Sequence, residues 1–302
     1  MGAVPVEGDT LARGRLLVET LGHCSACHTP RGPLMGQIDA RHLGGAVVNG
    51  WYAPDITPSP GGIGDWTDAQ LASFLQQGHV QTEDEIAIAG GDMGLVVERS
   101  LSQFDDADIQ AMVAYLRAVP PQDTTQPLSA GSTDPTLPIA ELEQPQTEAD
   151  ALLGHAGTDG ARLYQSACAS CHGATGQGSE MTGGFPSLAL VDATRDPDGL
   201  NLVQVISNGI DRKVGDNHAF MPPFGDAMTD AQIAATAAYV RETFGGQSGA
   251  ITADTVRSIR AGTIGVPAVI ELARPLAIGA IVLALALAAL ALFGLVRARR
   301  RQ

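Results

Sequence analysis

The sequence has 302 residues and little lysine, cysteine or aromatic side chain. Only one of its 18 basic residues is a lysine, Lys213, and 33 acidic residues give a formal net charge of −15. A nucleic-acid-binding surface needs clustered positive charge, so we expect no nucleic-acid partner. Four cysteines in a chain of this length are too few for a disulfide scaffold. The placement of those four cysteines is therefore more informative than their number.

All four cysteines fall in two copies of one motif, Cys-x-x-Cys-His. Two cysteines three residues apart on a helical turn face the same way, so both sulfurs can form thioethers with the vinyl groups of one haem. The histidine that follows can then bind the iron. The sequence predicts two covalently bound c-type haems (haem c), attached through Cys24, Cys27, Cys168 and Cys171, with His28 and His172 as proximal iron ligands.

Three other uses of the cysteines fit the pattern less well. A single zinc site would have to join Cys27 to Cys168, far beyond the roughly 15–20 residues of common zinc patterns. A thioredoxin-like dithiol is expected next to a βαβ unit, which the pattern lacks. Structural disulfides would not require a histidine after each pair. The aromatic content of 4% is also consistent with haem, because a buried porphyrin supplies a large, rigid apolar body.

The second axial ligands are predicted among the methionines. Met93 and Met221 each lie in a predicted loop between two helices of their repeat, where a thioether could reach the far face of the ring. Four other methionines are excluded as axial ligands, or are weaker candidates, because of their position in the sequence: Met35, Met181, Met112 and Met228. Met112 is expected in a helix core. The rival axial groups are His79 and His218, while His23, His42 and His155 are expected on the surface.

The chain also repeats its helical patterns. The segment 106–117 recurs as 230–241, and each places apolar residues on one face of a helix. Middle helices are expected at 67–78 and 200–207, and Thr229 is a plausible N-cap. No alternating strand pattern of useful length is visible, so the predicted fold is all-α. The proline-rich stretch 120–146 predicts an extended linker.

An uncharged apolar run, Leu276–Val296, lies near the C-terminus. As a helix it would span roughly 31 Å, enough for a hydrocarbon core of about 30 Å. It predicts one transmembrane helix, and the arginines that follow predict a cytoplasmic tail. The expected division is a first haem domain at 8–119, a linker at 120–150, a second haem domain at 151–246, a juxtamembrane segment at 247–275, the membrane helix at 276–296 and a basic tail at 297–302.

These features predict haem domains on the periplasmic side of a bacterial inner membrane. Met1–Thr10 shows neither the basic nor the apolar region of a secretory signal, so export is expected from the haem chemistry and not from this segment.

The second repeat resembles class I cytochrome c domains over residues 158–244. The resemblance rests on Gly160 and Tyr164 ahead of the haem motif, on the segment 183–188 and on 221–224. The first repeat is similar to the cytochrome subunits of periplasmic membrane-bound dehydrogenases that oxidise alcohols, aldehydes, sugars or N-heterocycles. The matching segments are 21–31, 52–58, 62–67 and 91–102. Many such subunits carry three haem motifs, whereas this chain has two.

The resemblance implies two class I cytochrome c domains followed by one C-terminal transmembrane helix. It also implies that the Pro186 carbonyl accepts a hydrogen bond from the proximal imidazole. The implied function is an electron-transfer subunit without catalysis of its own. It would relay electrons from a molybdopterin, flavin or quinoprotein dehydrogenase to ubiquinone, a cytochrome or a terminal oxidase. Two alternatives stay open: a dihaem peroxidase, if Met93 leaves its iron open, and a haem-based gas sensor.

Overall fold

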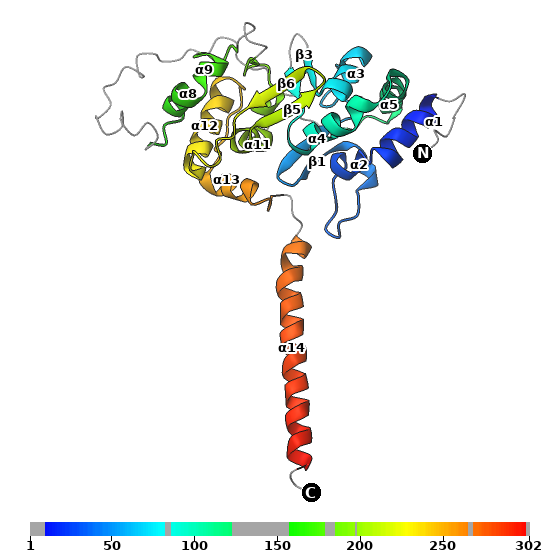
Figure 1. Cartoon of the computed structure of the whole chain (residues 1–302), viewed down its shortest axis with the longest axis vertical. Helices are drawn as coiled ribbons and strands as arrows, with labels where there is room; N and C mark the ends of the chain where they lie inside the picture. The colour runs from blue at the N-terminus through cyan, green and yellow to red at the C-terminus, as the bar shows by residue number, and fades with distance from the viewer. Residues whose placement is uncertain are drawn as a thin grey trace.

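The computed structural model describes residues 10–81, 86–122, 157–178, 185–196, 198–264 and 268–299. In the first half, the helices and helical turns are α1 (Thr10–Arg15), the π-helix η1 (Leu16–Leu21), α2 (Ser25–His28), η2 (Asp39–Arg41), α3 (Asp68–Gln77), α4 (Gly91–Arg99), η3 (Leu101–Gln103) and α5 (Asp106–Ala118). In the second half they are α8 (Gly160–Ala167), α9 (Ala169–His172), α10 (Asp192–Arg195), α11 (Leu200–Asn208), α12 (Asp230–Thr243), α13 (Ala253–Arg260) and α14 (Ala268–Arg299). The two halves form domains that lie side by side (Figure 1).

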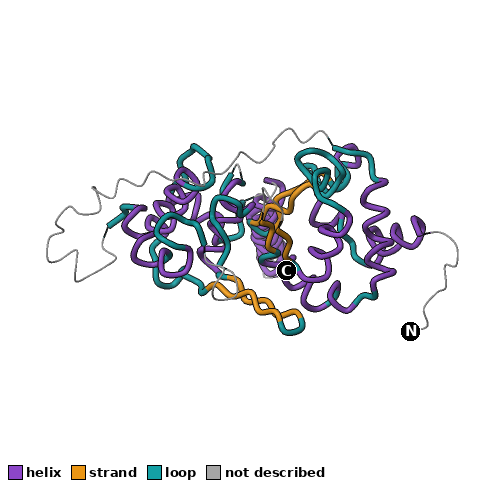
Figure 2. Tube along the Cα trace, turned by 90° about the horizontal axis from the view of Figure 1, so that it is seen from above, coloured by secondary structure: helices purple, strands orange, loops and turns teal. Residues whose placement is uncertain are grey.

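Short β-hairpins show that the predicted all-α fold class is wrong. The described residues form three two-stranded antiparallel sheets, drawn in orange in Figure 2. Their strands are β1 (Gly44–Val48) with β2 (Trp51–Asp55), β3 (His79–Gln81) with β4 (Ile86–Ile88), and β5 (Ile210–Val214) with β6 (Asn217–Met221). Asn49 and Gly50 connect β1 to β2 with φ values of 53° and 77°, the left-handed conformation that a tight hairpin requires.

The predicted middle and closing helices are confirmed, with the expected end signals. Thr67 forms a capping box with Gln70 at the start of α3, and Gly78 ends that helix in the left-handed conformation. Thr229 forms the equivalent capping box with Gln232 at the start of α12. These local signals satisfy backbone N–H groups that have no partner inside a helix, so they could be recognised without tertiary contacts.

In each domain the first helix crosses the closing helix of the repeat, α5 or α12, at a glycine. A Cβ atom on Gly14 of α1 would lie 1.9 Å from the Ala111 carbonyl oxygen of α5. A Cβ atom on Gly160 of α8 would lie 2.2 Å from the Ala235 carbonyl oxygen of α12. The helix backbones therefore approach so closely that a larger side chain has no space at either crossing.

Each domain has its own buried core, and each core also receives a side chain from the other domain. Val214, on the hairpin strand β5 of the second domain, belongs to the core of the first. Tyr52, on β2 of the first domain, packs against the core of the second. The two hairpins β1–β2 and β5–β6 therefore bind the domains together through apolar contacts.

Polar contacts reinforce this interface. The Tyr52 backbone N–H donates to the Asn201 side-chain oxygen at 2.9 Å, and the Asn201 amide donates back to the Tyr52 carbonyl at 3.0 Å. Arg212 of β5 is only 5% exposed and donates to the Ala89 carbonyl in the first domain. Because a buried guanidinium needs a partner, Arg212 favours one arrangement of the two domains.

The segment after the second domain differs from the sequence-based expectation. Residues 253–260, expected within the juxtamembrane segment 247–275, form α13, whose Val256 and Ile259 are buried in the second core. Helix α14 follows and extends away from both domains (Figure 1). Across the described ranges, none of the helices combines the length and apolarity needed to cross a bilayer, which takes about 20 consecutive apolar residues. The prediction of a transmembrane helix at 276–296 is therefore wrong.

The helix crossing of the first domain gives a stability prediction. Gly14→Ala should lower the free energy of unfolding by about 1–3 kcal/mol or more, because the added methyl group must push α1 and α5 apart. Urea denaturation followed by circular dichroism measures this. Gly36→Ala is the control, since a Cβ atom there meets nothing within 4 Å. Equal losses in the two variants would show that the crossing tolerates a side chain.

Candidate haem sites

The first Cys-x-x-Cys-His motif forms a single helical turn, α2. The His28 backbone N–H donates to the Cys24 carbonyl at 2.9 Å, which closes the turn. The His28 side chain is buried, and its Nδ1–H donates to the Pro54 carbonyl oxygen at 2.7 Å. With Nδ1 engaged as a donor, Nε2 carries the free lone pair. The ring is thus held in the tautomer that a metal-binding histidine uses.

Burial lowers the pKa of His28 below its ordinary value. The hydrogen bond to Pro54 and the nearby Asp55 carboxylate act in the opposite direction, but desolvation is the larger effect. A lowered pKa keeps the imidazole neutral near pH 7, and only the neutral form binds iron.

Pro54 lies on β2, so the hairpin β1–β2 supplies the carbonyl that orients His28. The strand end is fixed by the buried Asp55, whose carboxylate accepts hydrogen bonds from the Thr57 N–H and the Ser59 hydroxyl, both at 2.7 Å. Sequence reasoning noted Pro54 only as part of a resemblance and did not assign it this role. No local signal could have done so, because Pro54 reaches His28 only when the hairpin folds back over α2.

The second motif repeats this geometry on α9. The His172 backbone N–H donates to the Cys168 carbonyl at 3.0 Å, and the His172 Nδ1–H lies 3.3 Å from the Pro186 carbonyl oxygen. Burial again lowers the pKa of the histidine, with the hydrogen bond to Pro186 opposing it. The buried Tyr164 supports the turn, since its hydroxyl donates to the Gly173 carbonyl at 2.6 Å.

All four cysteines are free thiols. Burial raises the pKa of Cys24 and of Cys168 to about 11 each, so both are protonated at neutral pH. A reactive dithiol would need lowered pKa values instead. Cys24 packs against the first core and Cys168 against the second, so the pairs do not form one zinc site. Within the described ranges, no group of three or more His, Cys, Asp or Glu could hold a metal ion.

Met93 and Met221 lie in regular structure and not in the loops that the sequence predicted. Met93 is the third residue of α4 and packs, partly buried, against the first core. Burial raises the pKa of Cys27, and the Asp92 carboxylate beside Met93 is close enough to add to that effect. The start of α4 therefore lies near the first haem motif. Met221 ends strand β6, is half-buried and pairs with Ile210. Axial ligation by these two residues stays a prediction.

The other candidate ligands have different surroundings. Met112 and Met228 are buried in the two cores, and Met35 sits in a tight turn with φ 68°. His218 pairs with Asp211 at 2.7 Å, and His42 pairs with Glu19 at 2.8 Å. His79 lies on β3, where partial desolvation and, to a smaller extent, the nearby Arg212 lower its pKa. Met181 and His155 lie outside the described residues.

The residues at both motifs fit a covalently attached haem. Two free cysteines and a neutral, oriented imidazole are present at each motif. Large apolar side chains are exposed on the segments around the motifs and on α4 and β6: Leu21, Leu34, Ile38, Leu95, Val96 and Phe220. Bound haem, a large apolar body, would cover apolar side chains of this kind.

Family comparison agrees with this geometry. Residues 11–120 match the model described as "Cytochrome c", and residues 155–240 match the model described as "Cytochrome C oxidase, cbb3-type, subunit III". Each matched range contains one haem motif and its proximal histidine. The chain therefore contains two cytochrome c domains, and such domains bind c-type haem.

Individual proteins that are similar to the chain include cytochrome subunits of dehydrogenases. The chain is 37% identical over 271 residues to the fructose dehydrogenase cytochrome subunit of Gluconobacter japonicus, covering 86% of this chain and 54% of that protein. It is 32% identical over 268 residues to the gluconate 2-dehydrogenase cytochrome c subunit of Pantoea cypripedii, covering 84% and 57%. A dihaem c-type cytochrome of Cereibacter sphaeroides is 43% identical over 120 residues, covering 38% of each chain.

The expected resemblance to dehydrogenase cytochrome subunits is thus confirmed. The chain spans about half the length of the two dehydrogenase subunits.

The predicted axial ligand of the second domain can be tested directly. Met221→Ala should remove the methionine-to-iron absorption band of that haem and lower its reduction potential, because a thioether ligand raises the potential. Redox titration followed by visible spectroscopy measures both. Met112→Leu serves as the control, since Met112 is buried in the first core. An unchanged spectrum in Met221→Ala would exclude Met221 as a ligand.

Proposed function

We propose that this chain is a dihaem cytochrome c that receives electrons from the catalytic subunit of a dehydrogenase. It would pass them to a quinone, another cytochrome or a terminal oxidase. The main support for this proposal is that each domain independently presents two free thiols beside a histidine whose Nδ1 is directed at a proline carbonyl. Bound haem supplies one-electron redox chemistry, and the protein supplies its attachment, ligation and environment.

The names of the relatives support the dehydrogenase partner. They are cytochrome subunits of enzymes for fructose and gluconate, and one relative is a dihaem cytochrome. In this proposal the two domains lie in the periplasm, the compartment expected from covalent haem attachment. Two haem domains bound together by shared hairpins suit a relay, because the distance between the irons stays fixed during transfer.

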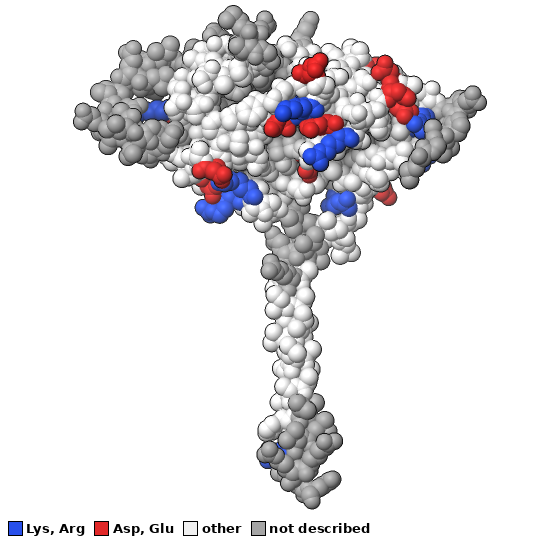
Figure 3. All heavy atoms as spheres, in the orientation of Figure 1, with Lys and Arg blue, Asp and Glu red and all other residues white. Residues whose placement is uncertain are grey.

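On one face of the molecule, surface charge would do little to attract or orient a partner. The chain carries a net charge of −15. On the face drawn in Figure 3, however, acidic and basic side chains are interspersed. Ion pairs such as Arg117–Asp68 at 2.9 Å neutralise part of the charge locally. Docking there would depend on apolar contact more than on long-range attraction.

The haem count tests the two-haem part of the proposal. The double variant Cys24→Ala/Cys27→Ala should carry half the haem of the unmutated chain, because only the second motif can then form thioethers. The same result is expected for Cys168→Ala/Cys171→Ala. Intact mass under denaturing conditions and a haem assay after unfolding measure it. A full haem content in either double variant would contradict covalent attachment at that motif.

Purification under mild conditions tests the electron-transfer role. The chain should copurify with a flavin, molybdopterin or quinoprotein dehydrogenase subunit. Adding that subunit's substrate should reduce both haems, as followed by their visible absorption. The control is the chain separated from its partner, which the substrate should not reduce.

A different result would indicate that the chain is itself an enzyme. If the reduced chain binds one equivalent of carbon monoxide and consumes hydrogen peroxide without a partner, one iron has an open site. The peroxidase alternative would then replace the relay.

A further inference from the structure

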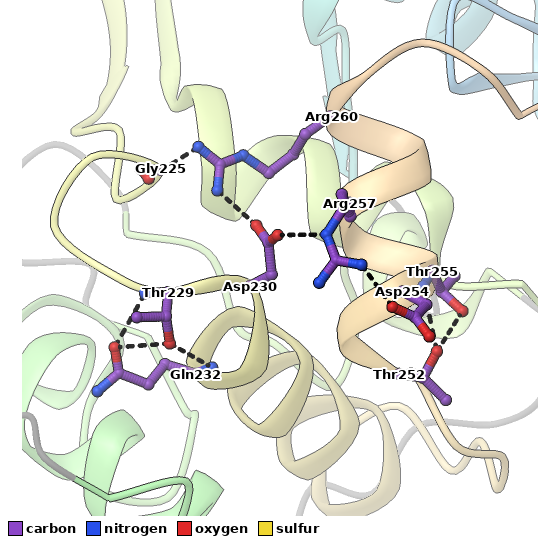
Figure 4. A network of polar contacts seen from close by, with 9 residues as sticks. All are labelled: Gly225, Thr229, Asp230, Gln232, Thr252, Asp254, Thr255, Arg257 and Arg260. Atoms are coloured by element: carbon purple, nitrogen blue, oxygen red, sulfur yellow. Dashed lines mark hydrogen bonds and ion pairs between the residues drawn. The ribbon is translucent and has the colours of Figure 1, made fainter.

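Helix α13 packs against α11 and α12 of the second domain. Its buried Val256 and Ile259 pack into the second core, and its N-cap Thr252 accepts from the Thr255 N–H at 3.1 Å. These contacts fix the helix along the start of α12, and Figure 4 shows its two arginines directed toward that helix. The position of the arginine side chains is therefore set by a packed helix.

Arg260, the last residue of α13, binds two groups at once. One guanidinium nitrogen donates to the Asp230 carboxylate at 2.7 Å, and the other donates to the Gly225 carbonyl at 2.9 Å (Figure 4). Arg260 is about one-third exposed and Asp230 about one-quarter. Partial burial and charge make these hydrogen bonds stronger than those between neutral surface groups.

Gly225 belongs to the segment that follows Met221. The segment leaves strand β6 at Met221 and reaches the N-cap of α12 at Thr229. On its other side it is held by α11, because the Phe224 N–H donates to the Ile206 carbonyl at 2.9 Å and the Gly225 N–H donates to the Ser207 carbonyl at 3.0 Å.

The segment and α11 approach each other closely at Gly225. A Cβ atom on Gly225 would lie 2.7 Å from the Ser207 oxygen. The backbone at Gly225 is thus held between α11 and Arg260.

We propose that Arg260 is a positioning residue for the second haem. It holds the segment 222–229 against α11 and thereby keeps Met221 at the iron. The inference rests on the proposed function and on the predicted axial ligation by Met221. A thioether is a weak ligand, so its occupancy depends on how firmly the protein holds the segment that carries it. A contact from α13, which follows the closing helix α12, then controls ligand exchange and potential.

The same network contains a matched control. Arg257 lies one turn earlier on α13 and also contacts Asp230, at 3.5 Å, and Asp254, at 2.6 Å. Its contacts do not include the Gly225 carbonyl in the described structure, and it is more exposed than Arg260. Replacing Arg257 removes a similar charge from the same helix while leaving the bond to the segment in place.

The experiment uses the full oxidised chain with both haems. Imidazole is added to the unmutated protein, Arg260→Ala, Arg260→Lys and Arg257→Ala, and displacement of methionine is followed through its iron band. The contribution of the first haem is taken from Met221→Ala. Arg260→Ala should bind imidazole at the second haem about tenfold more tightly, the effect of losing one or two charged hydrogen bonds. Arg257→Ala should stay within about twofold of the unmutated protein.

Arg260→Lys should be intermediate, because an ammonium group does not reproduce the planar pair of donors. Circular dichroism shows whether each variant keeps its helices. If Arg260→Ala is not folded, Asp230→Asn provides the second test, since it weakens the pairing of Arg260 and should tighten imidazole binding in the same direction.

Two failures are distinguishable. Equal imidazole affinities in Arg260→Ala and Arg257→Ala would overturn the positioning role while leaving ligation by Met221 intact. An unmutated protein whose iron band is the same as in Met221→Ala would instead overturn the ligation itself, and with it the closed second haem of the proposed function.

Discussion

The hydrogen bond from each proximal histidine to a proline carbonyl is the contact on which both haem sites depend. It fixes the tautomer, leaves Nε2 free and orients the ring. Burial of the same rings keeps them neutral. The two sites obtain the carbonyl differently: Pro54 lies on a hairpin strand, whereas Pro186 lies between α9 and α10. The shared requirement is an accepting oxygen at one position, and different local structures can supply it.

The hairpin that carries Pro54 also connects several other parts of the molecule. Trp51 on the same strand packs so closely on Gly91 that a Cβ atom there would lie 2.5 Å from the indole ring. Gly91 begins α4, which carries Met93. Tyr52 packs into the second core. One short hairpin therefore contacts the proximal histidine, the helix of the predicted distal ligand and the neighbouring domain. A structural change at any of these contacts would therefore alter the surroundings of the first haem.

The sequence predicted what depends on local chemistry. The haem motifs, the capped helices α3 and α12 and the core position of Met112 follow from spacing and end signals within a few residues. The hairpins were missed, although Asn49-Gly50 is a typical hairpin turn, because the strands beside it are short and interrupted by glycine and proline. The role of Pro54 and the docking of α13 depend on contacts between distant segments. The membrane helix was predicted from apolar length alone, and the described helices do not support it.

The two domains share a duplicated frame but not the surroundings of their predicted distal ligands. The glycine at the helix crossing and the motif turn occur in both. Met93, however, sits in the first turn of a helix, next to the Asp92 carboxylate, whereas Met221 ends a strand and precedes two prolines. A nearby negative charge stabilises ferric haem relative to ferrous haem, because the oxidised form carries one more positive charge. The Asp92 carboxylate would therefore lower the potential of the first haem.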